Sequence, residues 1–126
     1  MKPLPVYGNG LNIRDWLHVK DHCDGIFLAL TKGRSGAVYN FGADSEKTNL
    51  EIANVILNQM GLNQSSIEFV ADRLGHDLRY SVSFEKAKSD LGFSPHISFE
   101  EGMKETIDWF SKIENLKQFK SDIYNV

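Results

Sequence analysis

The stretch Asp72-Arg73-Leu74-Gly75-His76-Asp77-Leu78-Arg79-Tyr80 places three potential cations, two carboxylates and a glycine within nine residues. Arg73 can bind a phosphate or carboxylate through parallel hydrogen bonds, and His76 can change its charge near neutral pH. Gly75 lets the backbone approach a ligand closely. The composition leaves two interpretations open: a solvated loop with internal ion pairs, which contribute little at a surface, or an anion-binding site.

The flanking segments indicate that this stretch is a loop between two extended segments. Ile67–Val70 is rich in strand-forming residues and leads into it, while Tyr80–Ser83 extends away from it. Loops between regular elements commonly carry binding residues. Its position therefore favours the anion site.

Composition and charge limit the classes of function. The 126 residues, 41% apolar and 25% charged, are typical of one globular domain. The net charge of −3 argues against the broad basic face that nucleic acid or an anionic membrane requires. Cys23 is the only cysteine, which excludes an internal disulfide and a thiolate metal cage and favours an intracellular setting. We therefore expect a cytoplasmic protein without a nucleic-acid, membrane or metal partner.

The beginning of the chain is predicted to be extended. Two prolines within Met1–Gly8 favour a strand, which starts with no preceding element, as if a longer chain came before it. A turn at Gly8-Asn9-Gly10 leads to Asn12–Val19, where alternating residues predict a second strand. Arg14 and Trp16 share one face of it. That face is either covered by a bound molecule or is an exposed strand face.

The next segment predicts a helix and then a short strand. Asp21 is expected to be the N-cap and Gly33 to follow the last turn. The apolar positions of this helix follow helical spacing and are predicted to face the core: Cys23, Ile26, Phe27 and Leu30. Ala37–Phe41 contains strand-forming residues and is predicted to be a strand ending at Gly42.

Thr48-Asn49-Leu50-Glu51 fits a capping box, in which the threonine hydroxyl and the glutamate each bond a free amide at the start of a helix. The apolar stripe of this predicted helix is Ile52, Ala53, Ile56, Leu57 and Met60, and Gly61 ends it. Asn49 lies in the first turn, where the free amides favour anions. Alternatively, it is a second capping residue.

Two further helices complete the predicted domain. Ser83 is expected to cap a short helix with Phe84, Ala87 and Leu91 inward and Gly92 at its end. Ser98-Phe99-Glu100-Glu101 repeats the capping-box pattern. The buried side of the helix that follows is predicted to hold Phe99, Met103, Thr106, Ile107 and Phe110. We predict a domain over residues 1–114 and a terminal tail over residues 115–126.

Alternating short strands and helices without internal repeats predict one mixed α/β unit. The sequence has no Gly-x-Gly-x-x-Gly after a strand, no phosphate loop, no Gly-x-Ser-x-Gly elbow and no His-Glu-x-x-His helix. We therefore predict no catalytic, cofactor-binding or metal-binding residue in this chain.

Several segments resemble, in order and spacing, the carboxy-terminal part of the dTDP-glucose 4,6-dehydratase family, within the extended short-chain dehydrogenase/reductase superfamily. They are Pro3–Gly8, Asn12–His22, Tyr39–Gly42, Thr48–Leu50, Asp72–Tyr80, Leu91–Pro95 and Phe99–Gly102. The Arg-Asp-aromatic stretch is shared with sugar-nucleotide epimerases and decarboxylases, whereas Asp-Arg-x-Gly-His-Asp-x-Arg-Tyr points to the dehydratases. The family usually has proline at the position of Leu74, and leucine leaves this loop freer.

The resemblance implies a small mixed α/β substrate-binding lobe without its Rossmann lobe. In the complete enzyme, an amino-terminal Rossmann lobe holds NAD and supplies a Tyr-x-x-x-Lys pair and the acid/base carboxylates. The implied reaction oxidises the sugar at C4, removes water across C5 and C6, and returns the hydride to C6. The implied partners are a dTDP-sugar nucleotide, the chain's own Rossmann lobe and, for the parent, a second copy in a homodimer.

The resemblance also implies a role for each candidate site residue. Pro5, Val6 and Tyr7 would line the nucleotide pocket. Arg14 would reach the diphosphate or ribose, Asn49 would add a hydrogen bond, and Arg73 with His76 would close on the nucleotide. The isolated lobe is expected to be inactive and to expose a surface that can drive self-association. The alternatives are the lobe of another sugar-nucleotide epimerase or decarboxylase, and a free-standing module that binds an anion or a protein.

Overall fold

The computed structural model describes residues 3–112; the predicted tail, residues 115–126, lies outside them. The elements are, in chain order, β1 (Leu4–Tyr7), β2 (Ile13–Asp15), α1 (Val19–Lys32), β3 (Glu46–Thr48), α2 (Asn49–Gln59), the 3₁₀ turn η1 (Gln64–Ser66), β4 (Ile67–Val70), β5 (Arg79–Tyr80), α3 (Glu85–Leu91) and α4 (Phe99–Phe110). Helices and short strands alternate, which confirms the predicted mixed α/β class. Within these residues, every helix is too short or too polar to cross a membrane.

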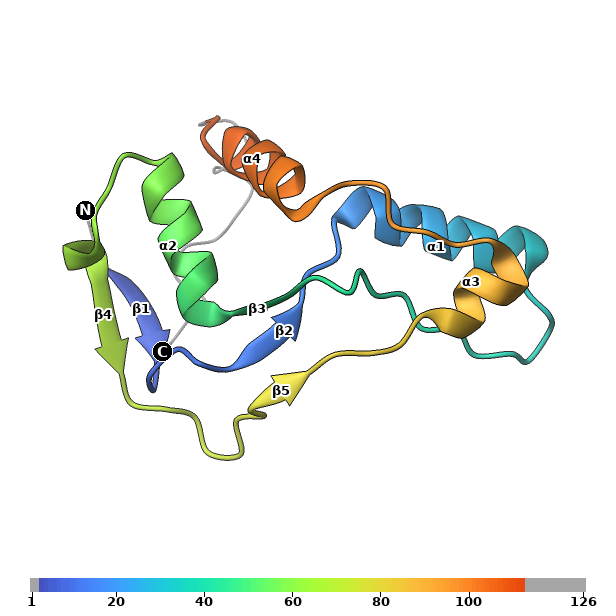
Figure 1. Cartoon of the computed structure of the whole chain (residues 1–126), viewed down its shortest axis with the longest axis horizontal. Helices are drawn as coiled ribbons and strands as arrows, with labels where there is room; N and C mark the ends of the chain where they lie inside the picture. Colours follow the sequence, from blue (N-terminus) through green and yellow to red (C-terminus); the bar gives the residue numbers. More distant parts are fainter. Residues whose placement is uncertain (1–2, 113–126) are drawn as a thin grey trace.

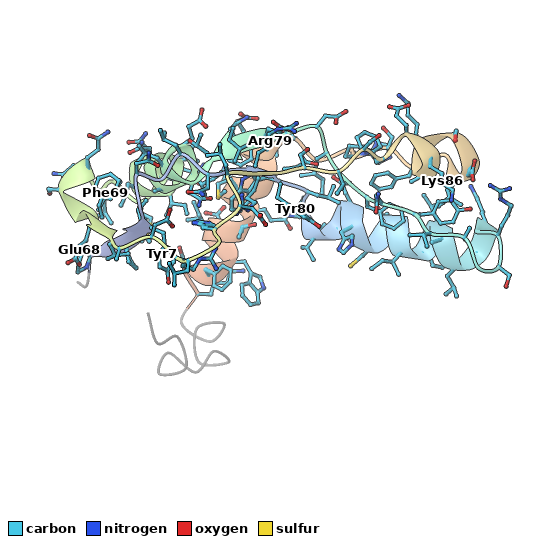
Figure 2. The ribbon with its side chains drawn as sticks, turned by 90° about the horizontal axis from the view of Figure 1, so that it is seen from below. Tyr7, Glu68, Phe69, Arg79, Tyr80 and Lys86 are labelled. Atoms are coloured by element: carbon cyan, nitrogen blue, oxygen red, sulfur yellow. The ribbon has the colours of Figure 1, made fainter. Side chains whose placement is uncertain are left out.

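The elements gather at two ends of an elongated molecule (Figure 1). At one end, β1 pairs in parallel with β4, from Leu4 opposite Ile67 to Tyr7 opposite Val70, and α2 packs beside them. At the other end, α1 packs on α3. A small sheet of order β3-β2-β5 lies between the two ends. In a view turned by 90°, Tyr7 and Phe69 mark the β1–β4 end, and Lys86 marks the α3 end (Figure 2).

Each end has its own buried apolar residues. Val6 of β1 and three residues of α2, Ile52, Ala53 and Leu57, are buried at one end. At the other end, the buried cluster consists of Phe84, Ala87, Leu91 and Phe93, with Leu17, Leu28, Ala29, Tyr39 and Phe41 packed against it. The Phe93 ring meets Phe41 and Phe84 edge to face, at centroid distances of 4.9 and 5.7 Å.

Both predicted capping boxes are confirmed. Thr48 accepts a hydrogen bond from the Glu51 amide, and the Glu51 carboxylate accepts one from the Thr48 amide. Ser98 and Glu101 make the same exchange at the start of α4. The predicted inward residues of α3 are buried as well. On α4, however, Thr106 and Phe110 are exposed, so the predicted buried side is narrower.

The predicted strand over Asn12–Val19 is too long, and Asp21 is not an N-cap. β2 ends at Asp15 because its antiparallel partner β3 offers only three register positions. His18 caps α1, and its Nδ1 accepts from the Lys20 amide at 3.4 Å. Asp21 is buried in the first turn, where its carboxylate accepts hydrogen bonds from the backbone amides of His96 and Ile97.

The predicted core face of α1 is exposed, and so is Cys23. The residues that α1 turns inward lie on a different face: Asp21 and Gly25 are buried, and Leu28 and Ala29 pack on the α3 end. Gly25 allows this close approach, because a Cβ atom there would lie 2.7 Å from the Phe41 ring. Small residues of α1 and Leu28 therefore meet the core of this chain, whereas Cys23, Ile26, Phe27 and Leu30 face outward.

Ala37–Phe41 is not a strand in the structure, although its residues alternate as in one. Tyr39 and Phe41 pack inward, whereas Val38 and Asn40 are exposed. Within residues 3–112, no backbone hydrogen bond joins residues 38–41 to a neighbouring segment. A strand needs a partner ladder, and the described chain does not supply one here.

Candidate functional site

One hollow lies between β1 and the first turns of α2. We call it the apolar hollow; it is lined by Leu4, Pro5, Val6, Tyr7, Asn49, Ile52, Ala53 and Ile56. Asn49 is the first residue of α2, and its amide donates to the Asn12 carbonyl at 3.0 Å. The hollow thus combines an apolar wall with a polar side chain at a helix N-terminus.

A second hollow lies under the loop that follows β4. We call it the cationic hollow; it is lined by Arg14, Arg73, Leu74, Gly75, His76 and Asp77. Gly75 has φ +70°, a conformation that residues with a side chain rarely adopt, so it forms the turn between Arg73 and His76. Arg14 enters from β2, far away in sequence. The fold thus brings together two guanidinium groups and an imidazole.

Tyr7 joins the two hollows. It lines the apolar hollow, while the Arg73 guanidinium lies over its ring at 5.2 Å from the centroid. The His76 ring meets the Tyr7 ring edge to face, with the centroids 6.3 Å apart. Each of the predicted site residues therefore lines one of the two hollows. Tyr7 lines the apolar hollow and contacts two residues of the cationic hollow, Arg73 and His76.

A hydrogen bond to Asp72 fixes the orientation of His76. The His76 Nδ1 lies 2.7 Å from the Asp72 Oδ1, and only 3% of the His76 side chain is exposed. This bond, together with one from the Arg73 amide, lowers the pKa of the Asp72 carboxyl. Asp72 is therefore ionised near neutral pH, so Nδ1–H donates to it. Nε2 then accepts when the ring is neutral and donates when it is charged.

The arginines of the region differ in what they bind. Arg79 forms a two-pronged ion pair with the Glu46 carboxylate, which lowers the pKa of Glu46. Within residues 3–112, neither Arg73 nor Arg14 forms a close ion pair with a carboxylate; Arg14 donates to the Ile13 carbonyl at 2.6 Å. These two side chains are therefore able to bind an anion that enters the cationic hollow.

Three positions that the sequence interpretation left without a role also shape the site. The buried Asn12 donates from Nδ2 to the Asp77 carbonyl at 3.1 Å. The Asp15 carboxylate accepts from the amides of Ala43 and Ser45, each at 2.8 Å. Gly8 gives room to Asp72, because a Cβ there would lie 2.8 Å from Oδ2. Asn12 and Asp15 could have been noticed as polar residues within a predicted strand. For Gly8, the sequence indicated only a turn.

Trp16, which the sequence placed on one face with Arg14, does not join the site. It lines a different hollow against α4, together with His18, Gly102 and Met103. Its Nε1 is buried without a hydrogen-bond partner among the described residues. Arg14 and Trp16 therefore do not form a common stacking surface.

A protein-family model described as GDP-mannose 4,6 dehydratase matches residues 1–106, so the chain belongs to this family. Curated relatives named dTDP-glucose 4,6-dehydratase confirm the resemblance found in the sequence. The relative from Actinoplanes sp. is 50% identical over 107 residues, which cover 85% of this chain and 33% of the relative. The relative from Haemophilus influenzae is 44% identical over 120 residues, covering 86% and 36%.

Solved structures of dTDP-glucose 4,6-dehydratases share the fold. DesIV from Streptomyces venezuelae, with NAD and TYD bound, has a TM-score of 0.88 and 43% identity, and the match covers 94% of this chain and 36% of that one. The Bacillus anthracis enzyme in complex with NAD has a TM-score of 0.84 and 49% identity, covering 90% and 36%. The chain thus spans about a third of the length of the relatives it matches.

Proposed function

We propose that this chain is the sugar-nucleotide-binding lobe of a dTDP-glucose 4,6-dehydratase, which converts dTDP-glucose to dTDP-4-keto-6-deoxyglucose. The observation that carries the proposal is the pair of hollows joined at Tyr7, one apolar and one cationic. A nucleotide has this division, with a flat base at one end and a diphosphate at the other. The base occupies the apolar hollow beside Asn49, and the diphosphate meets Arg14, Arg73 and His76.

Calorimetric titration of the full chain with dTDP and with UDP tests the binding. We expect Arg73→Ala to weaken dTDP binding by roughly 1.5–3 kcal/mol, about tenfold or more in Kd, because a charge-assisted contact is lost. Arg34→Ala is the matched control, since it removes the same charge from a turn at the α3 end, where Arg34 pairs with Asp90. Equal affinities for the two variants would remove Arg73 from the site.

The reaction requires groups that we assign to the other lobe. No glycine-rich turn joins a strand to a helix in residues 3–112, so these residues do not fit NAD, and we assign NAD binding to an amino-terminal Rossmann lobe of the parent enzyme. Residues 1–114 form the substrate-binding domain in this proposal. The chain alone is expected to be inactive; formation of a 4-keto sugar from dTDP-glucose by the purified chain would contradict this.

The outward face of α1, made of Cys23, Ile26, Phe27 and Leu30, supports the assignment of a Rossmann-lobe partner. These residues are exposed, and within the described chain no backbone hydrogen bond joins residues 38–41 to a neighbouring segment. About two thirds of the Actinoplanes sp. relative and of the Haemophilus influenzae relative lies outside the matched region. We assign this remaining part as the occupant of the face, because a contiguous exposed apolar face marks an interaction site.

A binding assay separates this partner from a second copy of the chain. We mix the chain with the amino-terminal two thirds of the Bacillus anthracis relative and follow complex formation by analytical ultracentrifugation. Phe27→Glu should abolish the mixed complex, and Leu78→Glu, a control at an exposed loop position, should not. Self-association of the chain without a mixed complex would overturn the assignment and would identify α1 as a contact between copies. If the mixed complex forms, the homodimer of the parent enzyme is formed through other surfaces.

A second candidate is the corresponding lobe of a UDP-sugar enzyme. The UDP-glucuronic acid 4-epimerase from Bacillus cereus, in complex with UDP-glucuronic acid and NAD, has a TM-score of 0.79 at 25% identity. The titration distinguishes the two, because preference for UDP over dTDP favours the epimerase class. If neither nucleotide binds and the amino-terminal part forms no complex, the chain is instead a free-standing binding module.

A further inference from the structure

Asn12 is a buried polar residue that joins two parts of the candidate site. It is 5% exposed, lies one position before β2, and donates from Nδ2 to the Asp77 carbonyl at 3.1 Å. Its own carbonyl accepts from the Asn49 amide at 3.0 Å. Buried polar groups are nearly always hydrogen bonded. The side-chain amide and the backbone carbonyl of Asn12 therefore both need these partners. Asn12 therefore ties the cationic-hollow loop to the first residue of α2.

Two hydrogen bonds join this loop to the segment around β2, and one of them comes from a side chain. In residues 3–112, the Asn12–Asp77 bond is the one side-chain hydrogen bond that joins residues 72–78 to another segment, since the remaining bonds of Asp72 lie within the loop. The neighbouring backbone bond, from the Ile13 amide to the Leu78 carbonyl at 2.8 Å, holds the end of the same loop. The loop carries Arg73 and His76, so this anchor contributes to their placement, together with the contacts that both side chains make with the Tyr7 ring.

We propose that Asn12 is a positioning residue for nucleotide binding: without touching the ligand, it fixes the cationic-hollow loop at a set distance from Asn49. The inference rests on the proposed function. A ligand that spans both hollows needs its two sets of contacts at a fixed separation. A loop that must first be ordered loses part of the binding free energy to that ordering. The anchor thus raises affinity by preorganisation.

Asn12→Leu tests the proposal in the full chain, because leucine keeps the volume but removes the donor to Asp77. We expect dTDP to bind about tenfold more weakly. Asp21→Asn is the matched control: Asp21 is 2% exposed and also holds a distant backbone segment, but at the α1 end. Both variants should lower the Tm, and only Asn12→Leu should raise the Kd. An unchanged Kd for Asn12→Leu, or an equal loss in both variants, would reduce Asn12 to a structural role.

A readout without ligand separates this inference from the proposed function. Trypsin cleaves after Arg73, inside the loop, and after Arg34, in an exposed turn at the other end. Asn12→Leu should raise the rate of cleavage after Arg73 relative to that after Arg34 severalfold, and Asp21→Asn should not. If wild-type chain fails to bind dTDP, the proposed function fails, and this ratio still decides whether Asn12 anchors the loop. An unchanged ratio would overturn the anchor.

Discussion

Helices α1 and α2 carry similar apolar stripes in the sequence, but the structure treats them in opposite ways. Three of the predicted stripe residues of α2 are buried, and Leu57 is 4% exposed. The predicted stripe of α1 faces outward, and Leu30 is 81% exposed. Helical spacing of apolar residues therefore indicates that a face will be covered. It does not indicate whether the same stretch of chain supplies the cover.

The difference follows from what each helix packs against. α2 follows β3 directly and lies on β1, so its stripe meets strand residues such as Val6. α1 packs on α3, where its residues Leu28 and Ala29 meet the buried cluster, and its Asp21 carboxylate holds residues 96 and 97, which leaves Ile26, Phe27 and Leu30 outside. One face of α1 thus packs on the core of this chain, and a second, apolar face stays exposed. A helix with two such faces can pack between two domains. Our proposed second domain is the Rossmann lobe.

The largest expected effect separates the two stripes directly. Leu57→Ala should lower the free energy of unfolding by about 2–5 kcal/mol, because it empties buried volume. Leu30→Ala makes the same change at an exposed position and should alter it by less than about 0.5 kcal/mol. Urea denaturation of the chain measures both. Similar losses in the two variants would mean that the α1 face is covered in solution.

A smaller effect concerns the start of α2. Thr48→Ala removes the hydroxyl that accepts from the Glu51 amide and should cost about 1 kcal/mol. Thr31→Ala is the control in α1, where the hydroxyl donates to the Phe27 carbonyl within the helix. That change should be close to neutral, since alanine favours helix. Thermal denaturation of the pair checks whether the capping box, rather than any threonine, provides the stability.

The smallest expected effect is the pH dependence of the same cap. Hydrogen bonds from Thr48 lower the pKa of Glu51 below its ordinary value of 4.5. A lowered folded-state pKa contributes stability that is complete above the unfolded-state pKa and is lost as the pH falls through the folded-state pKa. Acidification below about pH 4.5 should therefore reduce the Tm less in Glu51→Gln than in wild type. Parallel Tm profiles for the two proteins would contradict a role for the charged cap.

Local chemistry explains which features were predictable from the sequence. Thr48 with Glu51 and Ser98 with Glu101 are short-range arrangements, so their helix starts were found correctly. The strand Ile67–Val70 was also found, because strand-forming residues stand next to a polar turn. The residues Arg73 and His76 stood out through their chemistry, and the structure places them together with Arg14. Their role in nucleotide binding stays a prediction.

Features that depend on distant partners were not predictable. Asp21 looks like an N-cap in isolation, but its partners are the backbone amides of His96 and Ile97, which lie far along the chain. Ala37–Phe41 has the composition of a strand but lacks a ladder in the described residues. The length of β2 is likewise set by β3. In each case the deciding atoms lie far away in sequence, or outside the described chain.

The small β3-β2-β5 sheet has a further consequence for hydrogen exchange. Its strands contain three, three and two residues, so few backbone bonds connect the α2 end with the α3 end. Regions with separate buried clusters commonly open as separate cooperative units. We expect amides of α2 and amides of α3 to exchange with different opening free energies. The pairing of β5 with β2 should open first, because it has only two register positions.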